Sequence, residues 1–143
     1  MLDAVYMPGC WDLLHVGHIR AIYKASRLAS SMIVGVADDN VVKQDKGHSP
    51  IVPLEQRIEM LEALWFVDSA FAYHELEFLT HLNMFQPSVM AVSESWGNDY
   101  RHHDAEYWCR DREVPLIKIP YTDDVSTSKI KRRVIIESLE VPQ

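Results

Sequence analysis

The sequence has little cysteine, no long apolar run and no basic leader. Its two cysteines, Cys10 and Cys109, lie 99 residues apart, a spacing that fits neither a disulfide framework nor a zinc knuckle and suits a reducing cytoplasm. No apolar run approaches the roughly 18 to 20 residues needed to cross a bilayer. The first residues include Asp3 and no basic region, so we do not expect a secretory signal. These absences predict a cytoplasmic protein without a membrane span.

Positive charge is also scarce. The 21 Asp and Glu residues outnumber the 14 Lys and Arg residues, which gives a formal net charge of −7 at pH 7. Such an acidic chain is not expected to bind nucleic acid, although a local basic patch could hold a small phosphorylated molecule. The length of 143 residues, with 48% apolar and 24% charged residues, is typical of one globular domain, residues 1–143.

Short apolar runs alternate with longer segments of helical periodicity. The runs are rich in Val and Ile, as buried parallel strands are, and cover residues 4–7, 32–36, 67–72, 89–92 and 116–119. Helices are expected at residues 16–28, 54–65, 75–85, 103–112 and 126–139. In the second of them, Leu61, Leu64 and Trp65 would share the apolar side. This order predicts an α/β fold, a Rossmann-like parallel sheet of about five strands with helices on both faces. Ligands of such folds bind in the loops at the carboxyl ends of the strands.

The loop after the first run places two histidines at the start of a predicted helix. We expect Gly9 to permit a tight turn, and Gly17 to let a ligand approach the backbone where the helix begins. A helix N-terminus binds anions through its unpaired N–H groups and partial positive charge. His15 and His18 would lie on one face, from which they could donate hydrogen bonds to a polyphosphate. A zinc pair completed by Asp12 is the alternative.

Two segments resemble the signatures of the cytidylyltransferase-like nucleotidyltransferase superfamily. Residues 9–18, GCWDLLHVGH, are similar to its G-x-F-D-x-x-H-x-G-H motif. Residues 125–131, VSTSKIK, resemble its second motif, I-S-T/S-T/S-x-I. The two segments stand in the expected order, so the resemblance covers nearly the whole chain, whose length is close to that of glycerol-3-phosphate cytidylyltransferases.

The resemblance implies particular site residues. The phosphates of a nucleoside triphosphate would be held by a catalytic set: His15, His18, Lys46, Ser126 and Thr127. Lys46, followed by Gly47, would stand in a loop that closes over the β- and γ-phosphates. Nucleotide binding would involve Gly9, Cys10, Trp11, Asp12, Gly17, Glu94, Trp96, Tyr121, Thr122 and Ser128. Asp39 and Arg57 would shape the acceptor site.

Two departures from the superfamily pattern bear on specificity. Residues 93–97 read SESWG where many relatives have G-D-D-W or G-x-D, so only Trp96 matches that loop. Tyr121 stands where choline-phosphate and glycerol-phosphate cytidylyltransferases carry an arginine. The resemblance therefore implies nucleotidyl transfer more firmly than it implies which nucleotide and which acceptor are the substrates.

The implied reaction is nucleotidyl transfer with release of pyrophosphate. The expected substrates are CTP and a small phosphorylated alcohol such as glycerol 3-phosphate. The alternatives are adenylyl transfer from ATP to a sugar phosphate of the heptose type, which the segment Pro53–Arg57 (PLEQR) also resembles, and a nucleotide-binding module without catalysis. A magnesium ion would accompany the triphosphate, with no metal site built from protein residues. The superfamily further implies a homodimer.

Overall fold

Five parallel strands form a single sheet at the centre of the protein, in the order β3-β2-β1-β4-β5. The structure is a computed structural model that describes residues 2–97, 99–123 and 125–140. The strands are Leu2–Gly9 (β1), Ser31–Ala37 (β2), Ser69–Tyr73 (β3), Pro87–Ser93 (β4) and Leu116–Ile119 (β5). The predicted Rossmann-like sheet of about five strands is confirmed.

Both faces of the sheet are buried because side chains alternate along each strand. In β1, Ala4 and Tyr6 belong to the core on one face, whereas Val5 and Met7 belong to the core on the other. A strand buried on both sides must be apolar at nearly every position, which is why the short Val- and Ile-rich runs identified the strands so well.

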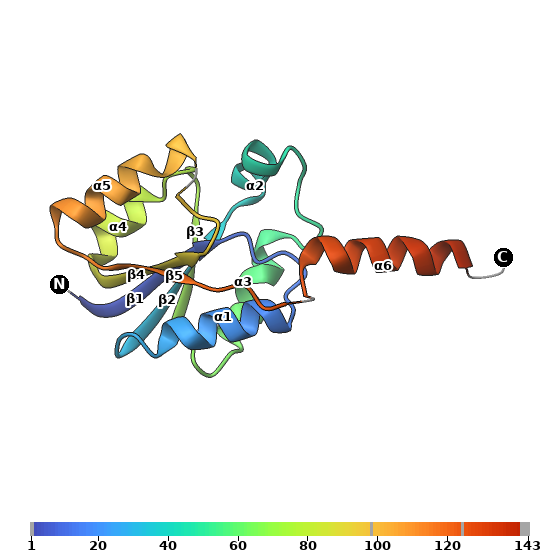
Figure 1. The fold of residues 1–143 in the computed structure, drawn as a ribbon, viewed down its shortest axis with the longest axis horizontal. Coiled ribbons are helices and arrows are strands. Elements are labelled where there is room, and N and C mark those ends of the chain that lie inside the picture. Colours follow the sequence, from blue (N-terminus) through green and yellow to red (C-terminus); the bar gives the residue numbers. More distant parts are fainter. Residues whose placement is uncertain (1, 98, 124, 141–143) are drawn as a thin grey trace.

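The helices cover both faces (Figure 1). Helices α1 (Val16–Ser26) and α3 (Leu54–Glu62) pack on the face that contains Val5, and α2 (Asp39–Lys46), α4 (Leu79–Phe85) and α5 (His103–Asp111) on the other. A short 3-10 turn, η1 (Tyr100–His102), precedes α5. The last helix, α6 (Thr127–Glu140), extends away from the sheet and has no buried residue. No helix in the described part of the chain is long and apolar enough to span a membrane.

Helix α2 occupies a segment for which the sequence predicted a loop. The Asp38 side chain accepts a hydrogen bond from the backbone N–H of Val41 at 2.7 Å, and Gly47 ends the helix in the left-handed conformation at φ 79°. Val41 and Val42, two residues of this helix, are buried in the core. Lys46 is therefore the last residue of a helix, and its predicted placement in a loop was wrong.

Two helix boundaries also differ from the prediction. The helix expected over residues 75–85 begins only at Leu79, because Phe78 adopts a left-handed conformation that a helix cannot contain. The helix expected over residues 54–65 ends at Glu62. Trp65 consequently lies beyond the helix and is 83% exposed, not packed on its apolar side.

Candidate active site

A cavity of about 530 Å³ lies between the N-termini of α1 and α6, beside the carboxyl ends of β1 and β5. The two segments that carry the sequence motifs are brought together there. The predicted site residues that line this cavity are Gly9, Cys10, Trp11, Asp12, His15, Gly17, His18, Lys46, Tyr121, Thr122, Ser126, Thr127 and Ser128.

The loop between β1 and α1 is held by the indole ring of Trp11. The Nε1–H group of the ring donates to the carbonyl oxygen of Gly35 at 2.9 Å. The backbone of Trp11 has a positive φ of 59°. A Cβ on Gly9 would lie 2.7 Å from the Trp11 ring. Gly9 thus makes room for the indole ring; it has no positive φ, so the tight turn predicted for it is not its role. A positive φ at a residue other than glycine, as at Trp11, is an unusual conformation that occurs often at functional sites.

His15 and His18 cap α1 reciprocally. The Nδ1 atom of His15 accepts from the backbone N–H of Gly17 at 3.0 Å, and Nδ1 of His18 accepts from the backbone N–H of His15 at 3.3 Å. The two imidazole rings stack with their centroids 3.8 Å apart. The expectation that they share one face is therefore met, with the first histidine at the N-cap and the second in the first turn.

The role of Gly17 differs from the prediction. A Cβ at this position would lie 2.8 Å from Cε1 and 2.9 Å from Nδ1 of His15. The missing side chain therefore makes room for the imidazole ring, so that the ring, and not a ligand, approaches the backbone at the start of the helix.

The capping bonds fix the tautomers of both histidines. A neutral imidazole accepts at one nitrogen and donates at the other, so with Nδ1 accepting, the proton is on Nε2. Burial lowers the pKa of His15, and burial, the neighbouring His15 and the charge of Lys46 lower the pKa of His18 to about 4. Near neutral pH each ring is an uncharged hydrogen-bond donor.

Asp12 joins three parts of the site. Its carboxylate accepts from the backbone N–H groups of Ile51 and Val52, each at 2.8 Å, and its carbonyl oxygen accepts from the Thr127 hydroxyl at 2.9 Å. The ammonium group of Lys131 is 3.9 Å from the carboxylate. Because both carboxylate oxygens are engaged, Asp12 is poorly placed to complete a zinc pair with the histidines.

The start of α6 forms the opposite wall of the cavity. The Ser126 hydroxyl accepts from the backbone N–H of Lys129 at 3.1 Å, so Ser126 is the N-cap of α6. Ser126, Thr127 and Ser128 all line the cavity. Two helix N-termini with hydroxyl and imidazole donors thus border one space, which suits a ligand with several negative charges.

A second cavity, of about 330 Å³, adjoins the first and shares with it Pro8, Gly9, Cys10, Lys46, Ser93 and Tyr121. Its wall combines polar side chains, among them Asp45, Lys46, Arg101 and His102, with apolar and aromatic ones: Val41, Val42, Tyr73, Leu76, Phe78 and Trp96. Trp96 is buried and stacks on His102 with the ring centroids 4.4 Å apart. Trp96 thus lies at the second cavity only, whereas Gly9, Cys10 and Tyr121 of the predicted nucleotide-binding set line both cavities.

Arg101 is a residue of this second cavity that the sequence did not reveal. Its guanidinium group pairs with Asp45 of α2 at 2.7 Å and with Asp99 beside η1. It therefore bridges the two segments that flank the cavity. Neither Arg101 nor Asp45 belongs to a sequence motif. The one signal in the sequence is that they follow β4 and β2, whose carboxyl ends lie at the ligand-binding edge of the sheet.

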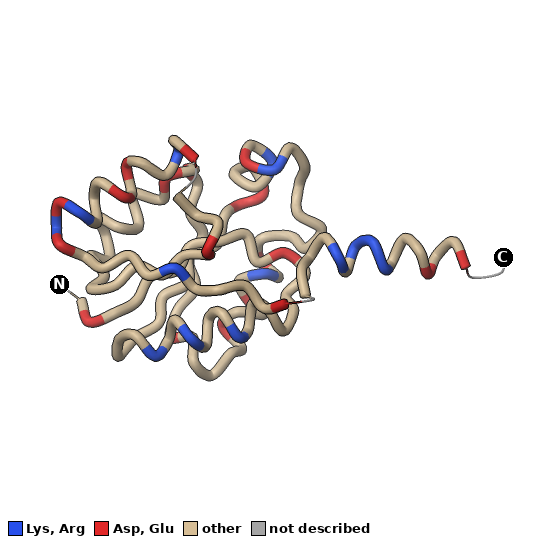
Figure 2. The backbone as a smooth tube through the Cα atoms, in the orientation of Figure 1, with Lys and Arg blue, Asp and Glu red and all other residues tan. Residues whose placement is uncertain are grey.

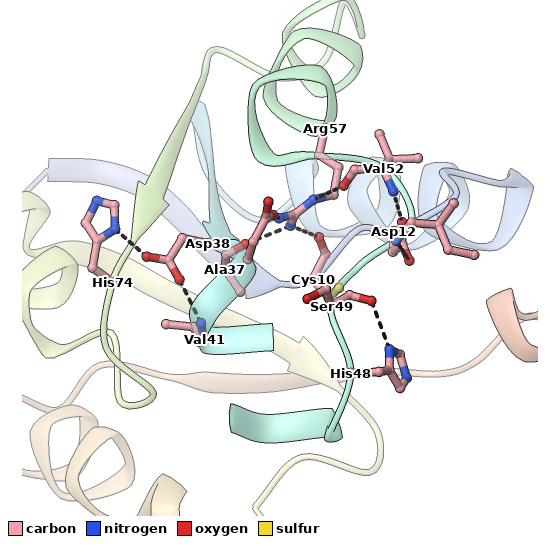
Figure 3. Close-up of polar contacts among 12 residues, drawn as sticks. Cys10, Asp12, Ala37, Asp38, Val41, His48, Ser49, Val52, Arg57 and His74 are labelled. Carbon is pink, nitrogen blue, oxygen red and sulfur yellow. Dashed lines mark hydrogen bonds and ion pairs between the residues drawn. The ribbon is translucent and has the colours of Figure 1, made fainter. Parts of the chain in front are cut away.

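Arg57 lies beneath the site. Only 1% exposed, it donates to the carbonyl oxygens of Val52, Cys10 and Ala37 at 2.9, 2.6 and 2.7 Å and pairs with Asp39 at 2.6 Å (Figure 3). These bonds tie the ends of β1 and β2 to the turn before α3, which gives Arg57 a positioning role. Neither Arg57, Asp39 nor Glu94 lines either cavity.

The site contains no evident metal cage. Among residues 2–97, 99–123 and 125–140, no group of three His, Cys, Asp or Glu side chains could hold a metal ion.

Comparisons with known proteins agree with this geometry. A family model described as cytidylyltransferase-like matches residues 6–133. An FAD synthase from Pyrococcus abyssi is 35% identical over 134 residues, which are 91% of this chain and 90% of that protein. The bifunctional protein HldE from Proteus mirabilis is 34% identical over 131 residues, which are 88% of this chain but 26% of that protein.

A solved structure has the same fold. The lipopolysaccharide core biosynthesis protein from Thermoplasma volcanium superposes with a TM-score of 0.71 at 24% identity, over 84% of this chain and 98% of that chain.

Proposed function

Because the chain belongs to the cytidylyltransferase-like family of nucleotidyltransferases, we propose that it transfers an adenylyl group from ATP to a small phosphorylated acceptor and releases pyrophosphate. The observation that carries the proposal is the first cavity, where two helix N-termini, two imidazole donors and Lys46 surround one space. A triphosphate is the ligand whose charge such a set neutralises best.

The reaction is a direct displacement. A phosphate oxygen of the acceptor attacks the α-phosphorus of ATP, a new P–O bond forms, and the bond between the α-phosphorus and the bridging oxygen to the β-phosphate breaks. Pyrophosphate leaves with that oxygen. No covalent enzyme intermediate is needed, so neither Cys10 nor Cys109 has a chemical role.

The protein stabilises charge in this step. The Nε2–H groups of His15 and His18 donate to the α-phosphate as negative charge builds up on it, and their fixed tautomers mean that no reorganisation is required. Lys46 and the N-terminus of α6 hold the departing pyrophosphate. Phosphoryl-type transfers depend mainly on such positioning and charge stabilisation.

A magnesium ion bound with the triphosphate would add Lewis-acid stabilisation of the phosphate oxygens. The protein's own contribution is the surrounding set of donors, since its described residues offer no cluster of three metal ligands.

The similarity to FAD synthases supports ATP over CTP. FAD contains an adenylyl group joined to riboflavin 5′-phosphate (FMN), so its synthesis by nucleotidyl transfer uses ATP. The chain matches these relatives over nearly their whole length. We therefore favour adenylyl transfer, the alternative reading of the sequence, over transfer from CTP to glycerol 3-phosphate.

The second cavity supports an acceptor with a flat, apolar body. It opens beside Lys46, and its wall includes Tyr73, Phe78 and Trp96. These aromatic rings can pack against a planar ring system, and Asp45, Arg101 and His102 of the same wall are polar groups near which its polar edge could lie. FMN fits this description, with its phosphate near Lys46 and its ring in the second cavity.

The test is pyrophosphate release in the presence of Mg²⁺, with ATP and CTP each offered with FMN, heptose 1-phosphate, glycerol 3-phosphate, phosphocholine or phosphoethanolamine. We expect release with ATP and FMN, accompanied by FAD detected by chromatography. Release with CTP would overturn the choice of base, and release with ATP and heptose 1-phosphate would overturn the choice of acceptor. Triphosphate binding without turnover across the panel would favour a non-catalytic module.

A further inference from the structure

Two departures from the superfamily pattern meet in the structure. Ser95 belongs to the SESWG segment after β4, and Tyr121 follows β5, where an arginine was the expected residue. The hydroxyl groups of these two side chains are in hydrogen-bond contact. The sheet explains this contact, because the parallel neighbours β4 and β5 pair Ser93 with Ile119, and Ser95 and Tyr121 each lie two positions beyond that pair. The two departures are therefore one local feature.

Tyr121 lies at the junction of the two cavities. It lines both of them, as Lys46 does, whereas Ser95 lines only the second. Ser93, which also lines both cavities, has its hydroxyl oxygen 3.5 Å from that of Ser95. The contact with Ser95 therefore holds the hydroxyl end of the Tyr121 ring at the wall of the second cavity, which the proposed function assigns to the acceptor.

Tyr121 differs in its exposure from the other aromatic residues that line the two cavities. It is 58% exposed, whereas the others are at most 8% exposed: Trp11, Tyr73, Phe78 and Trp96. Those four rings belong to the hydrophobic core, so most of their surface is already covered by protein. Among the described aromatic residues of the cavities, Tyr121 therefore offers the most open ring surface to a ligand.

The two segments that carry the pair have no positive charge. Residues 93–97 and 119–126 contain no Lys or Arg. Figure 2 shows an acidic position, and no basic one, in the described chain between β5 and α6. An arginine at position 121 would offer a charged fork to a phosphate, but a phenol offers a flat ring and one hydroxyl group. This wall therefore suits an uncharged planar ring better than it suits a phosphate.

We propose that Tyr121, positioned by Ser95, is the residue that selects an acceptor with a planar ring. The ring of the acceptor stacks on the exposed phenol ring in the second cavity, and the phosphate of the acceptor reaches Lys46 at the junction. The hydroxyl contact with Ser95 fixes the phenol ring in advance, so less conformational entropy is lost on binding. This inference rests on the proposed adenylyl transfer to FMN, and it adds the side chain that recognises the flavin ring.

The test measures binding of the flavin ring separately from turnover. Flavin fluorescence is quenched when the flavin stacks on an aromatic ring, so a titration of FMN with protein reports binding without ATP. Riboflavin, which has the same ring and no phosphate, is titrated in parallel. Tyr121→Leu should weaken the binding of both flavins by the same factor, about threefold to tenfold, and should leave the KM for ATP unchanged.

Tyr107→Leu is the matched control, because Tyr107 is an exposed tyrosine of α5 that lines neither cavity. This variant should bind both flavins as the wild type does. Since Ser95 and Tyr121 are exposed, their variants should also keep the wild-type circular dichroism signal.

A double-mutant cycle tests the positioning role of Ser95. Tyr121→Phe and Ser95→Ala should each weaken flavin binding about threefold. The double variant should bind no more weakly than the weaker single variant, because both changes remove the same contact. Losses that multiply in the double variant would show that Ser95 does not act through Tyr121 and would overturn its positioning role.

The outcomes separate this inference from the proposed function. Unchanged flavin binding by Tyr121→Leu, when the wild-type protein forms FAD, would overturn the inference and leave the proposed function standing. A loss confined to FMN would assign Tyr121 to the phosphate, and a raised KM for ATP alone would assign it to the nucleotide; either result would overturn the inference. A wild-type protein that neither binds flavin nor forms FAD would overturn the proposed acceptor and the inference together.

Discussion

The two helix N-termini that border the first cavity are built very differently. Helix α1 begins with two histidines that cap it reciprocally, and it buries Ile22 and Ala25 against the sheet. Helix α6 is capped by Ser126 and has no fully buried residue; Thr127 contacts the Asp12 carbonyl oxygen, and Lys131 approaches the Asp12 carboxylate. One wall of the site is part of the core, and the other depends on a few polar contacts.

The difference indicates that the two walls have different roles in catalysis and in binding. The α1 wall holds its imidazole donors in fixed tautomers and positions, as the stabilisation of a charged transition state requires. The α6 wall offers hydroxyl and backbone N–H groups on a helix that contacts the α1 side through Thr127 and Lys131, and these groups suit the binding of phosphate oxygens. Removing a hydrogen-bond donor from the α1 wall should therefore reduce kcat. Removing one from the α6 wall should raise the KM for the triphosphate.

The largest effect is expected for His18→Ala. The variant removes an Nε2–H donor from the rigid wall, and the loss of one such donor reduces kcat by about 10²- to 10³-fold. Steady-state pyrophosphate release measures the change, and circular dichroism checks the fold. His48→Ala, which alters an exposed histidine outside both cavities, should keep wild-type activity. Normal turnover by His18→Ala would refute the mechanism.

Asp12→Ala should weaken both walls at once. The variant leaves the partly buried backbone N–H groups of Ile51 and Val52 without their acceptor, and a buried group that loses its partner costs about 1 to 3 kcal/mol. We expect the free energy of unfolding to fall by roughly 2 to 4 kcal/mol in urea titrations. Asp3→Ala, at an exposed position, is the control and should change it little. A stability equal to that of the wild type would show that the Asp12 network is not needed to hold the loop.

The pH dependence of the free energy of unfolding should depend on the histidines of the α1 wall and not on the hydroxyl groups of the α6 wall. Because the pKa of His18 is about 4 in the folded protein and 6.5 for a free imidazole, the unfolded chain binds a proton between these values that the folded chain does not. The free energy of unfolding should therefore fall as the pH decreases from 6.5 to 4, by on the order of 2 kcal/mol from this group. The lowered pKa of His15 acts in the same direction.

Urea titrations at several pH values would measure this slope. His18→Asn should flatten it, whereas Ser126→Ala, on the wall without an ionisable cap, should leave it unchanged. Equal slopes for the wild type and His18→Asn would contradict the assignment.

The smallest effect is expected for Thr127→Val, which keeps the size of the side chain but loses the hydroxyl contact to Asp12. One hydrogen bond contributes about 1 kcal/mol, so we expect an approximately fivefold higher KM for the triphosphate and a nearly unchanged kcat. Thr127→Ser, which retains the hydroxyl, is the matched control. If Thr127→Val lowered kcat and left KM unchanged, the α6 wall would not act mainly in triphosphate binding, contrary to the proposal.

The sequence predicted the sheet and the first cavity because their signals are local. Apolar runs identified the strands, and the histidine and serine motifs identified the two helix starts. The sequence did not predict α2, a short helix whose pattern of two valines and several charges resembles a loop. Nor did it predict that Gly17 accommodates the ring of His15, because that contact depends on the orientation of a side chain.

The second cavity was largely beyond sequence reasoning. Its wall combines Val41 from α2, Phe78 from the turn before α4, and Trp96 and Arg101 from the segment after β4. These residues belong to no common motif, and only the three-dimensional path of the chain brings them together. Trp65 illustrates the converse, since its spacing predicted a core residue and the early end of α3 left it exposed.

The contact between Thr127 and Asp12 has a consequence for how the molecule is made. It joins residues 115 positions apart, almost the full length of the chain. Contacts between distant residues close the longest loops and form slowly. During synthesis, the strand that begins the sheet emerges long before the serines that complete the cavity. A nascent chain can therefore possess its entire sheet while it still lacks the α6 wall of its active site.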